Sequence, residues 1–281
     1  MDRVVLLVVG RVSTETNTIQ GSDVNSGDRN ATSRRRFLAV VGTTVAGSAL
    51  GPAHLLGRDR FFASEGSEDG QRRSMRIGII GSGAMGGAVG LAWAAAGHEV
   101  FFSSRHPEEL TDLVGRAGSL AHAGLPQDAA AFGDVVLIAV PYGVLPQVGR
   151  DYARLMRGKI VIDCGNPRAD RDGPMADDAV KRGTGVTSAE YLPGVRLVRA
   201  FSALSARAMV DEAHRGGEKV GIPIAGDDAE AVATTVQLVE DSGFDPVVVG
   251  GLDRAREFDR GTDVYVKGMT AAQLREALGL R

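Results

Sequence analysis

The stretch Arg76-Ile-Gly-Ile-Ile-Gly-Ser-Gly-Ala-Met-Gly-Gly87 decides how this chain is expected to fold. A short apolar run ends at Gly81, and small, helix-compatible residues follow over Ala84–Ala96. Gly81, Gly83 and Gly86 have the GxGxxG spacing of a dinucleotide-binding turn. In such a turn the first glycine permits the tight bend, the second lets the backbone approach a pyrophosphate, and the third lets helix and strand pack closely. The diphosphate then lies on the free N–H groups of the helix start.

The spacing alone is a weak signal, because 38 glycines among 281 residues make chance matches common. The alternative is an ordinary glycine-rich turn between a strand and a helix, with no ligand. The strand-like run before the glycines and the helix-like segment after them favour nucleotide binding.

Strand-like and helix-like segments alternate from Met75 onward. We expect strands at Arg76–Ile80, Glu99–Ser103, Val135–Val140, Lys159–Asp163, Val195–Ala200, Val220–Ala225 and Pro246–Val249, and helices at Ala84–Ala96, Pro107–Arg116, Gly143–Met156, Ala229–Ser242 and Thr270–Leu278. Apolar strands without polar alternation, separated by helices, are typical of a parallel sheet covered on both faces. The pattern therefore predicts an α/β fold, a doubly wound and mostly parallel Rossmann-like sheet with extra C-terminal strands. Its ligand is expected at the carboxyl ends of the strands.

The residues after the second strand indicate which dinucleotide is preferred. An NAD site places Asp or Glu there to bond the ribose 2′-hydroxyl, whereas this chain has Ser104 and Arg105. Arg105 can bind a 2′-phosphate through its fork of donors, and Ser104 can add a hydrogen bond. Glu108 and Glu109 are expected to be poorly placed for the ribose. NADP(H) is therefore favoured, and the alternative is that Arg105 is a solvated loop residue.

The loops after later strands supply candidates for the nicotinamide side. Pro141 ends a strand and turns the chain over that side, where Tyr142 either walls the pocket or packs in the core. Asn166 is either an amide partner for nicotinamide or its ribose, or part of an ordinary Asx-Pro turn. Cys164 is expected to be a small buried residue, since nothing nearby would activate its thiol. His98 is expected to be structural.

Composition excludes several functions. An apolar share of 43% supports a real core, and a net charge of −3 with only short basic clusters predicts no nucleic-acid binding. The single cysteine excludes a disulfide within the chain. The five histidines are scattered without metal-ligand spacing, so no metal site is expected.

The beginning of the chain is unlike the rest. Residues 1–32 are predicted to be a disordered n-region. Ser33-Arg-Arg-Arg-Phe-Leu38, followed by an uncharged stretch, is similar to a twin-arginine export signal over 33–57. Its apolar core is too short for a stable membrane span. We expect a linker over 58–74, a folded domain over 75–281, and an exported, periplasmic or extracytoplasmic protein with no stable membrane span in the mature chain. The alternative is a chance basic patch before a buried helix.

Several segments in order along 75–281 resemble the family of F420-dependent NADP oxidoreductases. They are also similar to the oxidoreductase domain of the six-transmembrane ferric reductases. The matching segments are Met75–Gly87, Ser103-Ser-Arg105, Val140-Pro141, Ser188-Ala-Glu-Tyr-Leu-Pro193, Val198-Arg-Ala-Phe-Ser202, Ala225-Gly-Asp-Asp228 and Gly243-Phe-Asp-Pro-Val-Val-Val-Gly-Gly-Leu252.

This resemblance implies an NADP(H)-dependent oxidoreductase that exchanges hydride with a flavin or deazaflavin. F420 or a flavin is then the candidate second substrate, a small-molecule redox acceptor is the partner, and a homodimer is left open. No catalytic side chain and no metal are implied. The contacts implied for the adenosine and phosphate half of the coenzyme are Ser82, Gly83, Ala84, Met85, Ser104 and Arg105, together with Gly81 and Gly86 of the turn. Those implied for the nicotinamide half are Val140, Pro141, Asn166 and Ala200.

Two departures bear on the acceptor. Ser202 stands where the family often has Asn, and an export signal is unusual for a user of F420 and NADPH. The alternatives are an imine or 2-hydroxyacid reductase of the pyrroline-5-carboxylate reductase type, or a non-catalytic NADP(H)-binding protein. Those reductases add an all-helical C-terminal domain, whereas strand signals here continue to Val249.

Overall fold

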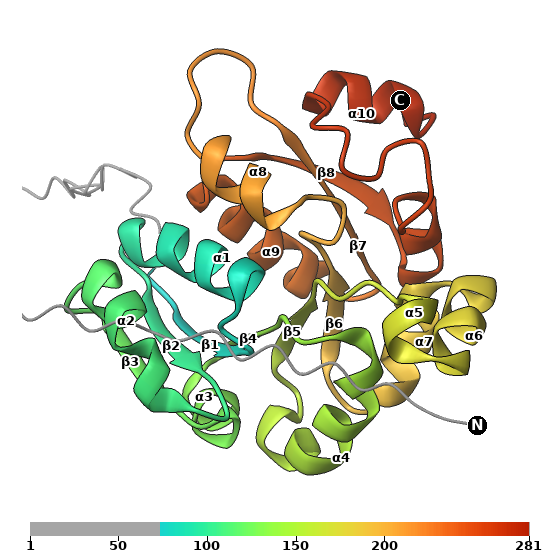
Figure 1. Cartoon of the computed structure of the whole chain (residues 1–281). Helices are drawn as coiled ribbons and strands as arrows, with labels where there is room; N and C mark the ends of the chain where they lie inside the picture. The colour runs from blue at the N-terminus through green and yellow to red at the C-terminus, as the bar shows by residue number, and fades with distance from the viewer. Residues whose placement is uncertain (1–73, 281) are drawn as a thin grey trace, which may run out of the picture. The chain divides into compact units, whose positions relative to one another are not determined.

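The computed structural model describes residues 74–280 (Figure 1). The predicted n-region and export signal, and the predicted linker up to residue 73, lie outside the described residues. The strands are β1 (Arg76–Ile80), β2 (Glu99–Ser103), β3 (Ala121–Gly124), β4 (Val135–Ile138), β5 (Ile160–Asp163), β6 (Arg196–Arg199), β7 (Gly221–Gly226) and β8 (Asp245–Gly250). The α-helices are α1 (Ala84–Ala95), α2 (Thr111–Ala117), α3 (Pro126–Phe132), α4 (Leu145–Met156), α5 (Ala169–Asp172), α6 (Pro174–Arg182), α7 (Thr184–Tyr191), α8 (Ala206–Asp211), α9 (Ala229–Asp241) and α10 (Ala271–Ala277), with 3₁₀ turns η1 (Pro107–Leu110), η2 (Tyr142–Val144) and η3 (Leu252–Glu257).

The described strands form one sheet in the order β3-β2-β1-β4-β5-β6-β7-β8. All neighbouring pairs are parallel apart from β6 and β7, which are antiparallel. Successive strands run to one side of β1 and then to the other, which is the reversal of a doubly wound sheet. The expected fold class is confirmed, and β7 and β8 are the extra C-terminal strands.

Both faces of the sheet are buried, which explains why its central strands are apolar throughout. In β1, Ile77 and Ile79 share a core with α1, α8 and α9, whereas Ile80 packs in a second core with α3, α4, α6 and α7. A third cluster joins β7 and β8 to η3 and α10. Alternate residues of one strand thus enter opposite layers, as the period of two in a strand requires.

The register of the sheet aligns the strand ends that precede the predicted site residues. Ile80 is opposite Ser103 on one side and Ile138 on the other, and the row continues through Asp163 to Arg199. The loops that follow these five positions therefore leave the same edge of the sheet. Every candidate contact residue lies in one of these loops or at the start of α1.

Several elements differ from the prediction. The helix expected at Pro107–Arg116 divides into η1 and α2, and the strands mostly shift or shorten by one or two residues. β3 and α3 were not predicted, nor was the run of helices from α5 to α8. β3 has only four residues, Ala-His-Ala-Gly, so it carries little intrinsic strand preference and forms through its pairing with β2.

His98 is structural, as expected. Its side chain is 2% exposed, Nδ1 accepts the Met75 N–H at 3.1 Å, and Nε2 lies 3.0 Å from Asp241 Oδ2. These contacts join the start of β1 to the end of α9. Among residues 74–280, no helix is both long and apolar enough for a membrane span.

Candidate functional site

The turn after β1 requires glycine at two positions for reasons of space. Gly81 has φ of +95°, and a Cβ there would lie 2.7 Å from Val140 Cγ1. A Cβ on Gly86 would lie 2.1 Å from the Gly81 carbonyl oxygen. These contacts hold α1 tightly against the strand ends, which is the packing that the motif predicts.

Gly83 is different, because a Cβ there would meet no atom within 4 Å. It is the N-cap of α1, where no side chain caps the helix and no acidic residue lies in the first turn. The first amides of α1 have no partner within the helix, and the positive end of the helix dipole lies behind them. An anionic diphosphate fits this arrangement.

Ser82 ties the turn to the end of β2. Its backbone N–H donates to the Ser103 carbonyl at 2.9 Å, and its hydroxyl oxygen accepts the Ser103 N–H at 2.8 Å. Ser103 is itself buried and donates to the Ile79 carbonyl at 2.6 Å. The glycine turn and the loop that carries Arg105 are therefore held at a fixed distance.

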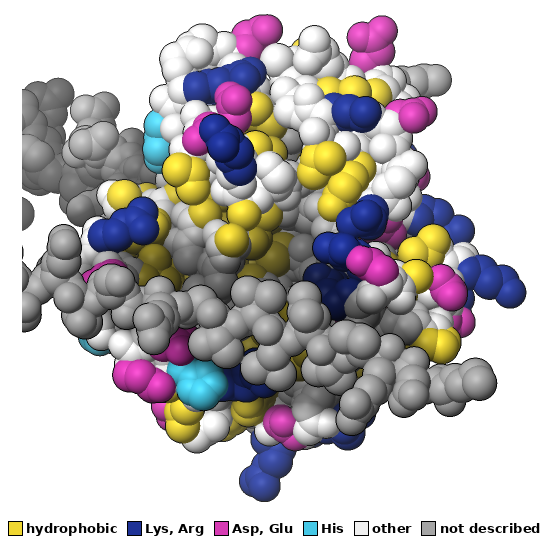
Figure 2. Space-filling model, viewed as in Figure 1, with side chains coloured by type: hydrophobic (Ala, Val, Ile, Leu, Met, Phe, Trp, Pro, Cys, Tyr) yellow, Lys and Arg dark blue, Asp and Glu magenta, His cyan; other side chains and the backbone are white. Residues whose placement is uncertain are grey.

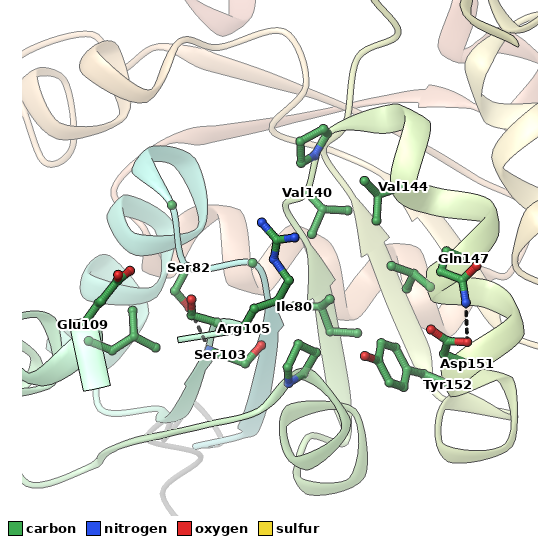
Figure 3. A pocket seen from close by; sticks show the side chains of 17 residues that line it. Ile80, Ser82, Ser103, Arg105, Glu109, Val140, Val144, Gln147, Asp151 and Tyr152 are labelled. Carbon is green, nitrogen blue, oxygen red and sulfur yellow. Dashed lines mark hydrogen bonds between the residues drawn. The ribbon is translucent and has the colours of Figure 1, made fainter. Parts of the chain in front are cut away.

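A cavity of about 660 Å³ opens at this edge of the sheet. The predicted contact residues Gly81, Ser82, Gly83, Ser104, Arg105, Val140 and Pro141 all line it. The volume lies within the range of roughly 300–1,000 Å³ of ligand pockets. In Figure 3 the Arg105 side chain extends between Ser82 and Val140, so its guanidinium reaches the middle of the cavity.

Arg105 is exposed and, within the described part of the chain, forms no ion pair or side-chain hydrogen bond. Ser104 accepts the His106 N–H at 3.1 Å, which leaves its own hydroxyl hydrogen available. The positions directly after β2 thus present donors and no carboxylate. They fit a 2′-phosphate, although the contact itself stays a prediction.

Two features of the cavity were not predicted. Glu109, on η1, lines it, although the sequence pattern predicts that this carboxylate is poorly placed for the ribose. The opposite wall consists of Val144, at the end of η2, and one face of α4, which carries Gln147, Val148, Asp151 and Tyr152. The spacing of three and four residues among them is the sequence signal that could have identified this wall.

Other predicted contacts lie outside the cavity lining. Ala84, Met85 and Gly86 form the first turn of α1, where Met85 packs against the core. Ala200 is fully buried, so its side chain belongs to the core. Their contacts with a coenzyme stay predictions.

Asn166 also lies outside this cavity. Its Nδ2 donates to the Ser202 carbonyl at 2.8 Å, and its Oδ1 is buried without a hydrogen-bond partner among the described residues. An unpaired buried carbonyl oxygen fits a ligand amide that would donate to it. The proposed contact with nicotinamide therefore stays a prediction with a chemically suitable atom.

Tyr142 packs in the core and does not wall the cavity. It is 1% exposed, and its hydroxyl lies 3.1 Å from Ser188 Oγ. Burial, with a smaller effect of the Asp163 charge, raises the pKa of the Tyr142 hydroxyl above its ordinary value. The hydroxyl is thus a neutral member of a buried network.

That network is centred on a buried ion pair at the ends of β5 and β6. Arg199 Nη1 donates to Asp163 Oδ2 at 2.7 Å and to the Asp163 carbonyl at 3.1 Å. Ser188 donates to Asp163 Oδ2 at 2.8 Å, and Asp163 Oδ1 accepts the Gly165 N–H at 2.8 Å. The carboxylate therefore shapes the loop that carries Asn166.

Cys164 is buried, as expected. It is 7% exposed and its Sγ donates to the Ile138 carbonyl at 3.3 Å. Burial raises the pKa of the thiol to about 12, with a smaller contribution from Asp163. A neutral, enclosed thiol is a poor nucleophile.

Charged side chains are mixed on the surface. Figure 2 shows basic and acidic groups interspersed on the visible face, with apolar side chains near its centre. Among residues 74–280 no group of three or more His, Cys, Asp or Glu is placed to hold a metal ion.

The reversal of strand order at β1, the glycine turn and the cavity together define an NAD(P)-binding Rossmann-like domain. Residues 76–167 match the family model described as NADP oxidoreductase, coenzyme F420-dependent. This part of the chain resembles that family, and the expected resemblance is confirmed.

Two curated relatives extend the match. The chain is 28% identical over 208 residues to metalloreductase STEAP3 of Rattus norvegicus, covering 71% of this chain and 39% of that protein. It is 27% identical over 223 residues to the F420-dependent NADP reductase of Methanothermobacter thermautotrophicus, covering 74% and 94%. The chain thus spans about two fifths of the first relative and nearly all of the second.

Solved structures show the same fold. A hypothetical protein from Sinorhizobium meliloti superposes with a TM-score of 0.61 at 26% identity, covering 70% of this chain and 95% of that one. A candidate F420-dependent NADP reductase from Arthrobacter superposes with a TM-score of 0.59 at 24% identity, covering 74% and 96%.

Proposed function

We propose that the protein is an NADP(H)-dependent oxidoreductase that passes hydride between nicotinamide and a flavin or deazaflavin ring such as F420. The observation that carries this proposal is the cavity lined by both Gly83, where a Cβ would meet no atom within 4 Å, and the unpaired guanidinium of Arg105. One group suits a diphosphate and the other a 2′-phosphate.

In this proposal each part of the chain has a defined task. The start of α1 binds the diphosphate, and Ser104 and Arg105 bind the 2′-phosphate. Val140 and Pro141 contact the nicotinamide half. The bound coenzyme would supply the nicotinamide ring that gives or takes the hydride. Transfer between two stacked rings needs position and exclusion of water, and no protein acid or base. This suits a cavity whose described lining residues include no catalytic dyad.

The test is anaerobic mixing of the purified protein with NADPH and F420, FMN or FAD in turn. We expect NADPH absorbance to fall with at least one of these acceptors. Binding of NADPH without turnover on any of them would favour the non-catalytic alternative and refute the flavin assignment.

The reductase alternative of the pyrroline-5-carboxylate type has less support. It predicts an all-helical segment after residue 200, but β7 and β8 lie in that segment and belong to the main sheet. No specific observation favours it over hydride exchange with a ring acceptor.

We propose further that the protein is exported by the twin-arginine route. The support is the hexapeptide that begins at Ser33, together with a domain that would bind its coenzyme before transport. In a bacterial host, replacing Arg34 and Arg35 with lysine should retain the protein in the cytoplasmic fraction. Equal export of the variant and the wild type would contradict the proposal.

A further inference from the structure

The cavity that holds Arg105 also holds a carboxylate of opposite charge. Glu109, on η1, lines the same cavity as Ser104 and Arg105. Within the described residues Glu109 makes no ion pair or side-chain hydrogen bond, with Arg105 or any other group. Its charge is therefore not neutralised by a neighbour, and Figure 3 shows it on the Ser82 side of the cavity.

This arrangement places two opposing charges around one binding space. A 2′-phosphate is attracted by Arg105 and repelled by Glu109, whereas a ribose 2′-hydroxyl carries no charge and can donate a hydrogen bond to a carboxylate. Glu109 thus favours NAD(H) relative to NADP(H), and Arg105 does the reverse.

We infer that Glu109 is a specificity-determining residue that lowers the preference of this site for NADP(H) over NAD(H). The inference rests on the proposed function, because it assumes that the cavity binds the adenosine half of the coenzyme. It goes beyond that function in assigning the preference for NADP(H) over NAD(H) to Arg105 and Glu109 together. The preference is therefore weaker than Arg105 alone would give.

Glu108 is a matched control. It is the neighbouring glutamate on η1, it lies outside the cavity lining, and its exposed carboxylate is 3.5 Å from His106 Nδ1. Changing either glutamate to glutamine alters the net charge of the protein equally, so the two variants separate a local effect from a general one.

The experiment is calorimetric titration of wild type, Glu109→Gln and Glu108→Gln with NADP⁺ and with NAD⁺, at low and high salt. We expect Glu109→Gln to raise NADP⁺ affinity about threefold to tenfold, the size expected for one partly screened charge, and not to raise NAD⁺ affinity. The gain should shrink at high salt, and Glu108→Gln should change NADP⁺ affinity less than about twofold.

Adenosine 2′,5′-bisphosphate serves as a further probe, because it contains the 2′-phosphate without the nicotinamide half. Its affinity should rise with Glu109→Gln as that of NADP⁺ does. An unchanged NADP⁺ affinity, a parallel gain for NAD⁺, or an equal gain with Glu108→Gln would overturn the inference while leaving the proposed function intact. Failure of the wild type to bind NADP⁺ or the bisphosphate would instead refute the proposed function.

Discussion

The glycines of the turn after β1 meet different physical requirements. Gly81 and Gly86 are needed by the fold, since a side chain at either would overlap backbone or neighbouring atoms, and Gly81 has a positive φ. Gly83 has no such constraint within the protein. The space above it is what a ligand bound at the start of α1 would use, so its substitution should affect binding more than folding.

Replacing Gly83 with alanine should lower NADP⁺ affinity by roughly tenfold, because the new methyl group would stand between the amides and the diphosphate. It should change the free energy of unfolding by less than about 1 kcal/mol, because its backbone is extended and the space is open. Gly86→Ala is the contrasting variant and should lose about 2 kcal/mol or more through overpacking. Equal stability losses in the two variants, measured by urea unfolding, would contradict this division.

Cys164 gives a prediction about reactivity and pH. As the single cysteine, with a buried thiol whose pKa is raised to about 12, it should resist iodoacetamide at about pH 8 until the protein is unfolded. Above the ordinary thiol pKa of 9.0 the unfolded chain releases this proton and the folded chain keeps it. The free energy of unfolding should therefore fall as the pH rises from about 9 toward 12, and Cys164→Ala should remove that part of the fall. Rapid alkylation of the native protein would show that the thiol is accessible.

At the scale of elements, the candidate site is assembled by loops that leave one edge of the sheet. The register row from Ser103 through Ile80 to Arg199 fixes where these loops start. The buried pair of Asp163 and Arg199 then holds the loop after β5 through the Gly165 N–H. α4 closes the far wall of the cavity, and η1 brings Glu109 to the near side.

Breaking the buried ion pair should be costly. Arg199→Met leaves Asp163 without its cation, and the expected loss is about 3–5 kcal/mol of unfolding free energy in urea titrations. Adding Asp163→Asn to this variant should restore part of the loss, because Asp163 then carries no unpaired charge, whereas Asp259, 3.6 Å from Arg199 Nη2, still loses its cation. A loss below about 1 kcal/mol for Arg199→Met would show that the pair contributes little.

Sequence patterns predicted the elements that carry strong periodicity or a motif. β1, the glycine turn, α1 and α9 appear within one or two residues of the expected bounds, and the donors at Ser104 and Arg105 lie beside the turn. β3 and the short helices α5 to α8 were missed because they depend on tertiary contacts more than on their own sequences. The place of Glu109 at the cavity could not be predicted either, because it follows from how η1 packs, whereas the spacing along α4 carried a signal for the far wall.

At the scale of the whole described unit, the reversal of strand order at β1 explains why a single cavity collects residues from distant segments. Segments around positions 82, 105, 126, 140 and 150 all reach it, because the crossovers on the two sides of β1 separate there. β7 and β8 extend the sheet beyond this point and are far from the glycine turn in strand order. The proposed coenzyme site therefore depends on the strand ends around β1 and not on β7 or β8.

The most direct test of that account is calorimetric titration of the full chain with NADP⁺ and NAD⁺, for the wild type and for Arg105→Gln. We predict that the wild type binds NADP⁺ more tightly than NAD⁺. Arg105→Gln should weaken NADP⁺ binding about tenfold, because a charge-assisted pair is lost, and should leave NAD⁺ binding nearly unchanged. No heat with either coenzyme, or the same NADP⁺ affinity in wild type and variant, would contradict the account.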